Sequence, residues 1–440
     1  MHSRSPIIGF LLLAFLTAGF CPGFCQQDRA EESALQVQLR SLPHVLEVKR
    51  IPGDSTLFLE AYELQFSQPL DHGRAGGPTF PQKVFLCHAA TDKPVVLSTE
   101  GYSAPWNHTA EPTKILKCNQ VTVEHRYFAT SRPDSLLWEY LTVKQSADDL
   151  HEVVTALKKI YRGPWVSTGV SKGGQTALLY RYFYPADVSV SIPYVAPVNI
   201  AQEDPRPMEF LRHVGPDSCR EKMRRFQIAM LAEEDRMLPK LEEHAKDRGY
   251  TFSLGLRKMY EFAVLEYPFS FWQYGRPNLC DAIPAPGSSP DTMFAHLSRA
   301  VPLSLFADEG VKFFEPFMYQ AYTEMGYYTY DIADFRGLLK AVTDPSPRIF
   351  APGNVPLRYQ CVTYQEINRW LQNEGNNIIY IYGEYDPWTA CAVQLTGRTN
   401  ALKIVKKAGS HGTKIRDLSP EQQQAVYRTL EEWLGVTIAR

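Results

Sequence analysis

The first part of the chain alternates short apolar runs with amphipathic segments. Residues 94–99 and 119–124 are short apolar runs of the kind found in buried strands. Apolar residues recur at helical spacing between 146 and 161, and a strand at 165–168 leads into a helix after Ser171. Strands that alternate with helices predict an α/β fold with a mostly parallel sheet, covered on both faces. Further strands are predicted at 57–66, 83–88 and 188–195.

The pattern changes after about residue 201. Residues 204–350 are rich in charged residues, proline and aromatics, with helical stretches and no clear strand alternation. Strand character returns at 377–382 and 401–405, and Ser419 can cap a last helix, with Pro420 in its first turn. This indicates an α/β domain interrupted by a helical cap. The predicted parts are a signal peptide at 1–25, the first part of the α/β domain at 26–202, the cap at 203–355 and the second part at 356–440.

The signal peptide is predicted from the amino-terminal pattern. Arg4 precedes an apolar run from Ile7 to Phe20, which is too short and too close to the start for a membrane span, and cleavage after Cys25 fits the small residues there. A lipoprotein anchor at Cys21 or Cys25 is the alternative, but phenylalanine precedes each cysteine, where lipoprotein signals favour a small residue. No other segment approaches membrane-spanning length. We therefore expect a secreted or periplasmic protein.

Composition narrows the possible partners. With 440 residues, 44% of them hydrophobic, the chain can bury a large core. The formal net charge of -2 and the absence of a long basic run do not favour nucleic acid or an anionic membrane surface as a partner. The oligomeric state stays open.

Six cysteines remain after the predicted signal peptide. An even number in an oxidising compartment predicts disulfides, and although sequence does not choose the connectivity, we expect neighbours along the chain to pair. There is no CxxC or HExxH pattern and the histidines are scattered, so neither a metal nor a cofactor is predicted. The six cysteines are Cys87, Cys118, Cys219, Cys280, Cys361 and Cys391.

The candidate chemistry begins with the segment G-V-S-K-G-G at 169–174. A G-x-S-x-G sequence between a strand and a helix is typical of a nucleophile elbow, where glycines permit a sharp turn that exposes the serine hydroxyl. The alternative is a small residue in a tight turn. Ser171 is therefore a candidate nucleophile.

The partners of such a serine follow in the order acid, then histidine. The strand at 377–382 leads to Asp386, and the strand at 401–405 leads to His411 on a glycine-flanked loop. Asp386 is preferred over Glu384 because its later position carries it past the strand end. The backbone N–H groups of Lys172 and Tyr102 are the expected oxyanion hole, and we expect the Lys172 side chain to be solvated or structural rather than a base.

The elbow and the acid and histidine segments belong to a larger set of segments, at residues 123–133, 140–142, 167–174, 181–185, 265–274, 323–327, 382–388 and 409–411. Together these segments resemble the prolyl tripeptidyl aminopeptidases, which are secreted bacterial serine peptidases. Parts of the same segments are similar to the related lysosomal Pro-Xaa carboxypeptidase and dipeptidyl peptidase group, whose elbow usually reads G-S-Y-G-G. The elbow of this chain is closer to the tripeptidyl family. The resemblance extends over nearly the whole mature chain.

The resemblance implies an α/β-hydrolase with a helical cap that removes tripeptides from peptides with a free amino terminus, preferably after proline. It also implies that Ser171, Asp386 and His411 form the triad. A dipeptidyl peptidase or Pro-Xaa carboxypeptidase on the same fold, or an esterase or lipase, is the alternative, because the distance from nucleophile to terminal anchor is not contained in the sequence.

An enzyme that requires a free amine needs a carboxylate to pair with it. Glu324 in the matched cap segment is one candidate, and Glu203 or Asp204 at the junction with the cap are others. A salt-bridged or solvated carboxylate is the alternative for each of them.

A proline pocket should be apolar, rigid and aromatic. Trp388 beside the acid, and Phe271 with Trp272 in the cap, are the candidates, with core packing as the alternative. Glu124 and Arg126 are expected to form a structural pair below the site.

Overall fold

The computed structural model describes residues 32–275 and 277–438. The predicted signal peptide at 1–25, with Cys21 and Cys25, lies outside these residues. Within the described ranges no helix has both the length and the apolar character needed to cross a membrane.

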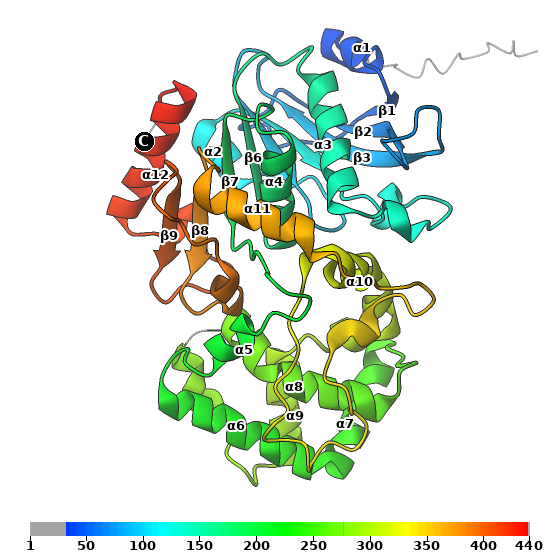
Figure 1. The fold of residues 1–440 in the computed structure, drawn as a ribbon, viewed down its shortest axis with the longest axis vertical. Coiled ribbons are helices and arrows are strands. Elements are labelled where there is room, and N and C mark those ends of the chain that lie inside the picture. The colour runs from blue at the N-terminus through cyan, green and yellow to red at the C-terminus, as the bar shows by residue number, and fades with distance from the viewer. Residues whose placement is uncertain (1–31, 276, 439–440) are drawn as a thin grey trace, which may run out of the picture.

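A single nine-stranded sheet forms the centre of the larger part of the molecule (Figure 1). The strand order is β1-β2-β3-β5-β4-β6-β7-β8-β9. The strands are β1 (Val45–Arg50), β2 (Glu60–Pro69), β3 (Thr79–His88), β4 (Val95–Thr99), β5 (Asn119–Val123), β6 (Trp165–Val170), β7 (Val190–Tyr194), β8 (Ile379–Gly383) and β9 (Leu402–Lys406).

Strand direction divides the sheet in two. From β5 through β4 and β6 to β9 every neighbouring pair is parallel, whereas β1, β2, β3 and β5 pair antiparallel. The prediction of a mostly parallel sheet is therefore confirmed. Strand β1 was not predicted, because of its six residues only Val48 is buried and the apolar alternation is weak.

Helices cover both faces of this sheet. Successive residues of a strand point to opposite faces, so Leu97 packs in the core beneath α3 while Val96 packs in the core beneath α12. This is the doubly covered arrangement of an α/β-hydrolase. The helices of this part are α1 (Ala34–Arg40), α2 (Glu111–Leu116), α3 (Val143–Leu157), α4 (Lys172–Phe183), α11 (Cys361–Asn373) and α12 (Pro420–Leu434).

The last helix begins as the sequence predicts. The Ser419 hydroxyl accepts the N–H of Gln422, and the Gln422 side chain accepts the N–H of Ser419 in return.

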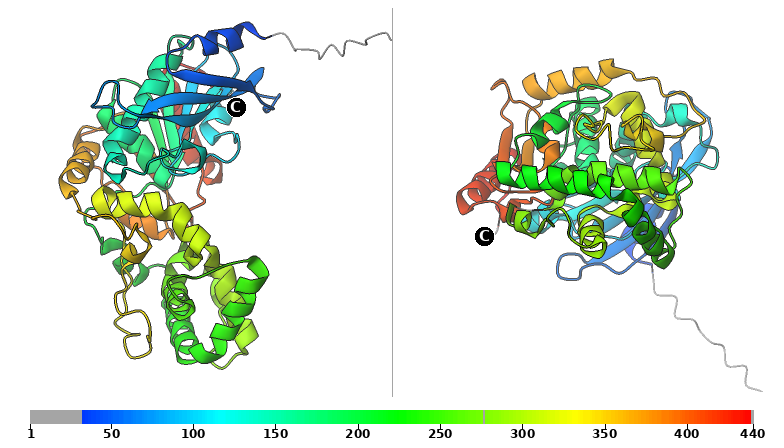
Figure 2. Two further views of the ribbon diagram at one scale, coloured as in Figure 1. Left: turned by 90° about the vertical axis from the view of Figure 1, so that its right-hand side faces the viewer. Right: turned by 90° about the horizontal axis from the view of Figure 1, so that it is seen from below.

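Between β7 and α11 the described residues form helices and no strand element, apart from an isolated bridge between Glu203 and Tyr327. Helices α6 to α9 gather at one end of the molecule, and α10 lies between them and the sheet (Figure 1; Figure 2). Their apolar side chains pack into one core around α8, which Phe128 and Trp388 of the sheet part join. The helices are α5 (Arg206–Leu211), α6 (Asp217–Ala232), α7 (Glu234–Arg248), α8 (Leu256–Tyr274), α9 (Pro290–Ala300) and α10 (Asp308–Gln320).

The expected pair of Glu124 and Arg126 is not formed. Arg126 instead makes a bidentate ion pair with Asp149 of α3, with distances of 2.7 and 2.8 Å, and Glu124 pairs with Lys83 at 2.9 Å. The two side chains lie in the same turn after β5 but each bonds to a different neighbouring element.

The cysteine prediction is right for one pair. Cys219 of α6 and Cys280 form a disulfide that joins two segments of the cap. The other four cysteines are free thiols, so pairing between chain neighbours is wrong for them; most of them are buried in separate places of the α/β core. They are Cys87, Cys118, Cys361 and Cys391.

Removal of this disulfide should destabilise the cap. It closes a loop with a sequence separation of 61. Because cross-linking restricts the unfolded chain, replacing both Cys219 and Cys280 by Ala should lower the free energy of unfolding by about 2–4 kcal/mol, measured by urea denaturation. Cys361→Ala, at a half-buried free thiol, is the control and should shift the midpoint far less. Equal midpoints for the double variant and the wild type would contradict a stabilising role.

Candidate active site

The segment 169–174 forms a sharp turn from β6 into α4. Ser171 has φ 56° and ψ -123°, a conformation that L-residues other than glycine seldom adopt. A Cβ on Gly169 would lie 2.2 Å from the Gly173 carbonyl oxygen, and one on Gly173 would lie 2.6 Å from that of Thr99. Only glycine fits at these two positions, and the close packing holds Ser171 in its strained conformation at the carboxyl end of the sheet.

The carboxyl ends of the next two strands bring an acid and a histidine together. Asp386 follows β8 and His411 follows β9, and His411 Nδ1 lies 2.8 Å from Asp386 Oδ2. Asp386 is fully buried and also accepts the N–H of Trp388. Glu384, the other acid considered, accepts the N–H of Ala408 instead.

Close backbone packing also sets the position of the histidine. A Cβ on Gly383, at the end of β8, would lie 2.4 Å from the Ser410 carbonyl oxygen, so the loop passes directly over this glycine. The His411 N–H donates to the Gln273 carbonyl oxygen of α8 at 2.9 Å. The histidine is therefore held by its side chain to the sheet and by its backbone to the cap.

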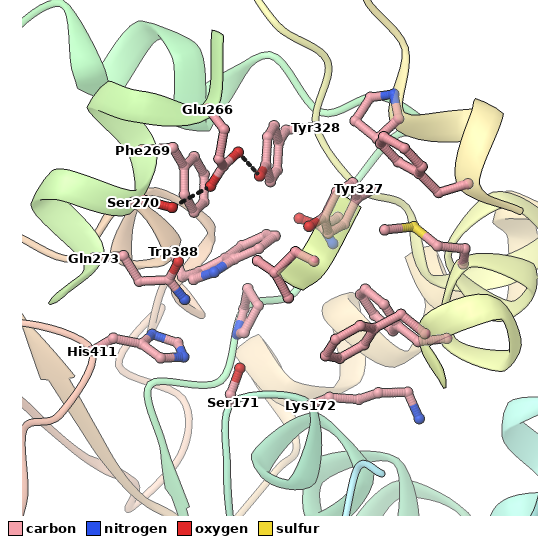
Figure 3. Close-up of a pocket in the computed structure, with 18 of the residues that line it drawn as sticks. Ser171, Lys172, Glu266, Phe269, Ser270, Gln273, Tyr327, Tyr328, Trp388 and His411 are labelled. Atoms are coloured by element: carbon pink, nitrogen blue, oxygen red, sulfur yellow. Dashed lines mark hydrogen bonds between the residues drawn. The ribbon is translucent and has the colours of Figure 1, made fainter. Parts of the chain in front are cut away.

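Ser171 and His411 line the same cavity, which has a volume of about 310 Å³ (Figure 3). Because Asp386 occupies Nδ1 of His411, Nε2 is the ring nitrogen that remains available to a hydroxyl in this cavity. That is the arrangement in which a histidine can take the proton of an attacking serine.

The loop after β4 lies directly against the first turn of α4. A Cβ on Gly101 would lie 2.5 Å from Lys172 Cβ and 2.6 Å from Gly173 N. Tyr102 and Lys172 both line the cavity beside Ser171. The Lys172 side chain is 2% exposed, so it is not solvated, and its Nζ lies 3.0 Å from His125 Nε2.

One face of α8 forms a wall of the cavity. The cavity-lining residues Glu266, Phe269, Ser270 and Gln273 are spaced i, i+3, i+4 and i+7, the spacing of a single helix face. In Figure 3, Ser171 and His411 lie at one end of the cavity and Glu266 at the other.

Glu266 is the carboxylate that lines this cavity, and sequence reasoning did not select it. It is 5% exposed and accepts hydrogen bonds from the hydroxyls of Ser270, Tyr328 and Tyr330 at 2.7 to 2.9 Å. Burial raises the pKa of Glu266, while these three hydroxyls act to lower it. No basic side chain is among its hydrogen-bond partners in the described part of the chain.

The carboxylates at the junction with the cap are bonded elsewhere. Asp204 forms an ion pair with Arg206 at 2.7 Å, and Glu203 accepts a hydrogen bond from the Ser346 hydroxyl. Neither lines the cavity. Both therefore bind structural partners, contrary to their selection as amine anchors.

Glu324 also lies away from the cavity. Its Oε2 accepts the N–H of Val143, in the first turn of α3, at 2.8 Å, and burial raises the pKa of Glu324 to about 7. Its carboxyl group connects the end of the cap to the sheet domain, which is a structural contact.

Aromatic rings line the cavity between Ser171 and Glu266. Trp388 is one of them, and its indole packs on Phe269, Tyr327 and Tyr328 with centroid distances of 5.1 to 5.5 Å. Two of these three contacts, those with Phe269 and Tyr328, are edge-on, which fixes the rings against one another.

Phe271 and Trp272 are not part of this lining. They lie five and six positions after Glu266, so they point away from the face of α8 that carries it, and both are buried in the cap core. The helical spacing within residues 265–274 could have separated the lining residues from the core residues, because it shows which positions share a face with Glu266.

Comparison with known proteins decides the family. Residues 30–440 match the family described as PS-10 peptidase S37. The chain belongs to this family. As a member of the S37 family it is a serine peptidase on an α/β-hydrolase fold. It is also 30% identical over 440 aligned residues to the prolyl tri/tetrapeptidyl aminopeptidase of Streptomyces mobaraensis, covering 98% of this chain and 92% of that protein.

Solved structures of lower similarity include other hydrolases. The proline iminopeptidase of Mycobacterium smegmatis is 13% identical with a TM-score of 0.42, covering 84% of this chain and 98% of that one. An acetyl xylan esterase from Paenibacillus sp. R4 is 11% identical with a TM-score of 0.38, covering 90% of this chain and 92% of that one.

The position of Ser171 predicts selective labelling. A fluorophosphonate should attach covalently to Ser171 in the wild type, because His411 can accept its proton, and mass spectrometry of the tryptic peptides would identify the site. Ser171→Ala should remain folded and take up no label, and Asp386→Asn should label far more slowly because the histidine tautomer is no longer fixed. If another residue were labelled, or if the wild type took up no label, Ser171 would not be the nucleophile.

Proposed function

We propose that this chain is a serine exopeptidase that releases tripeptides from free amino termini, with a preference for proline at the third position. The observation that carries the proposal is Glu266, a buried carboxylate that faces the same cavity as Ser171 and His411 and has no basic partner among the described residues. The name of the Streptomyces mobaraensis relative, a prolyl tri/tetrapeptidyl aminopeptidase, supports the same substrate class.

Glu266 suits an ammonium group. Its three hydroxyl partners satisfy part of its hydrogen-bonding capacity but bring no positive charge. In a largely apolar cavity a carboxylate and an ammonium attract each other more strongly than in water, because the effective dielectric constant is lower. A substrate with a blocked amine would leave the Glu266 carboxylate unpaired and would therefore bind poorly.

Helix α8 provides a measure of substrate length. Glu266 and Gln273 are seven residues apart, and at 1.5 Å per residue they differ by about 10 Å along the helix axis. The Gln273 carbonyl oxygen binds the backbone of His411, so this axial separation sets the scale of the distance between the amine anchor and the catalytic end of the cavity. Three extended residues span about 10 Å and two span about 7 Å, which favours a tripeptide over a dipeptide register.

The aromatic rings beside Trp388 suit a proline ring. Proline is rigid and apolar and loses little conformational entropy on binding, and flat aromatic faces contact it well. Trp388 follows Asp386 by two residues, which puts this surface next to the catalytic end of the cavity. Phe269, Tyr327 and Tyr328 hold the indole in place.

The proposed reaction is acyl transfer. His411 takes the proton of Ser171 as the hydroxyl oxygen attacks the carbonyl carbon of the third residue, and Asp386 stabilises the imidazolium that forms. The N–H groups of Lys172 and Tyr102 bind the oxyanion. His411 then protonates the leaving amine, and a water molecule, activated in the same way, releases the tripeptide from Ser171.

The site of action that we propose is outside the cytoplasm, in the periplasm or the medium. The signal-peptide pattern at 1–25 and the disulfide between Cys219 and Cys280 both support an oxidising compartment.

A series of p-nitroanilide substrates tests how many residues the enzyme releases and whether it requires a free amine. Ala-Ala-Pro-p-nitroanilide should be cleaved at least about 100-fold faster, in kcat/KM, than the acetylated compound, because the acetyl group removes the charge that Glu266 binds. Ala-Pro-p-nitroanilide should be slower, since it is too short to reach both ends of the cavity. Preference for the dipeptide would indicate a dipeptidyl peptidase. Equal rates for free and acetylated substrates would indicate an endopeptidase or an esterase, and action only at carboxyl termini would indicate a carboxypeptidase.

Glu266→Gln tests the amine anchor itself. The variant keeps the shape of the side chain but not its charge, so kcat/KM for the free tripeptide substrate should fall about 30- to 1000-fold, while the rate for the acetylated substrate changes little. Glu324→Gln is the matched control, because Glu324 is a half-buried carboxylate of the cap that lies outside the cavity. If both variants reduced the selectivity equally, Glu266 would not be the anchor.

A further inference from the structure

Lys172 is a buried lysine whose side chain has no role in the reaction described so far. It directly follows Ser171, and its side chain is 2% exposed. In Figure 3 the side chain extends away from His411, so it is not oriented to act as a base at the nucleophile. Burying an amine costs free energy unless it is hydrogen-bonded, so the partners of Lys172 indicate what the side chain does.

The hydrogen-bond partner of Lys172 is a neutral histidine. His125 Nδ1 lies 2.8 Å from the carbonyl oxygen of Arg126, which can only accept, so Nδ1 carries the proton and Nε2 is the acceptor. Lys172 Nζ lies 3.0 Å from this Nε2 and donates to it. Burial lowers the pKa of Lys172 well below its usual value, and burial together with Lys172 does the same to His125, so the two do not carry positive charge together.

Two aromatic rings enclose the same amine. Lys172 Nζ lies 5.8 Å from the ring centroid of Tyr102 and 5.7 Å from that of Phe128. The Phe128 ring also packs edge-on against both Tyr102 and His125. The amine is thus surrounded by aromatic rings rather than by carboxylates.

These contacts connect the two expected oxyanion donors. The His125 N–H donates to the Tyr102 carbonyl oxygen at 3.1 Å, and its ring accepts from Lys172. On the other side, Gly101 packs against the backbone of Lys172 so closely that a Cβ would not fit. His125 therefore holds the loop of Tyr102 and the first turn of α4 in one fixed relation.

We infer that Lys172 and His125 are positioning residues: their hydrogen bond fixes the backbone N–H groups of Tyr102 and Lys172 at the spacing that an oxyanion requires. The inference rests on the proposed function. If this hydrogen bond is lost, the spacing of the two N–H groups changes. Such a change raises the free energy of the transition state, in which the oxyanion exists, more than that of the bound substrate.

Lys172→Met tests this, because methionine keeps the apolar stem and removes the amine. We expect kcat for Ala-Ala-Pro-p-nitroanilide to fall about 10- to 100-fold with KM changed less than about twofold. The inhibition constant of Ala-Ala-boroproline, which forms a tetrahedral adduct with serine, should rise by the same factor as kcat/KM falls, whereas that of the product Ala-Ala-Pro should stay the same. A purely structural role would weaken both inhibitors equally or lower only the amount of folded protein, and either result would overturn the inference.

A second pair of variants serves if Lys172→Met does not fold. His125→Phe removes the acceptor and keeps a ring, and it should reproduce the loss in kcat; the double variant should be no worse than either single one, because the two groups act as a unit. His125→Gln retains an acceptor and should recover most of the rate. Lys403→Met is the control, since Lys403 is partly buried and bonds the Val393 carbonyl oxygen, and neither residue lines the cavity. Additive losses, or no rescue by Gln, would contradict the pairing.

The two proposals fail in different ways. If the wild type labels at Ser171 but does not cleave the tripeptide substrate, the proposed function is wrong. The fluorophosphonate labelling rate then takes the place of kcat, because its phosphoryl oxygen needs the same donors. A labelling rate unchanged by Lys172→Met and His125→Phe would overturn the positioning role alone.

Discussion

The geometry of the active site depends on how α8 meets the loop of His411. The His411 N–H donates to the Gln273 carbonyl oxygen, near the end of α8, while Asp386 holds the imidazole from the sheet. The same helix carries Glu266 two turns earlier on the same face. Because one helix positions both the backbone of the catalytic base and the carboxylate of the cavity, the two ends of the site are set relative to each other by that helix and not by a loop.

Three buried ionisable groups in or beside the cavity are stabilised in different ways. Asp386 has His411 and a backbone N–H, Glu266 has three hydroxyls, and Lys172 has a neutral histidine and two rings. Of the two carboxylates, only Asp386 has a partner that can become a cation. The absence of a cationic partner for Glu266 among the described residues leaves its charge available to a substrate, which is the physical basis of the exopeptidase proposal.

Much of the fold could be predicted because its signals are local. The alternation of apolar runs and amphipathic helices gave the parallel sheet, and the glycines around Ser171 and the order of Asp386 and His411 are patterns of a few residues each. β1 was missed because most of its side chains are exposed. Neighbour pairing of cysteines was right for Cys219 and Cys280 and wrong for the other four, because proximity along the chain says little about which strands and helices are neighbours in space.

The substrate-binding residues could not be predicted in the same way. Glu203, Asp204 and Glu324 were chosen by their position in the sequence, yet each bonds to a structural partner, and Glu266 was overlooked inside a segment that was itself recognised. What decides between them is the rotation of each helix about its axis, since Phe271 and Trp272 lie within six positions of Glu266 and face the core. That rotation depends on the packing of the whole cap.

Helix geometry also restricts the length of the released peptide, because a carboxylate on α8 faces the cavity only at certain positions along the helix. Moving the carboxylate by one position along α8 would rotate it about 100° out of the cavity, and moving it by a full turn would shift it about 5.4 Å along the axis. One extended substrate residue spans about 3.4 Å, so a shift of one turn exceeds one residue and falls short of two. A register that differs by a single residue therefore requires a different reach of the carboxylate side chain or a different tilt of α8. Changing the length of a cap loop would not supply either of these unless the contact between Gln273 and His411 also changed.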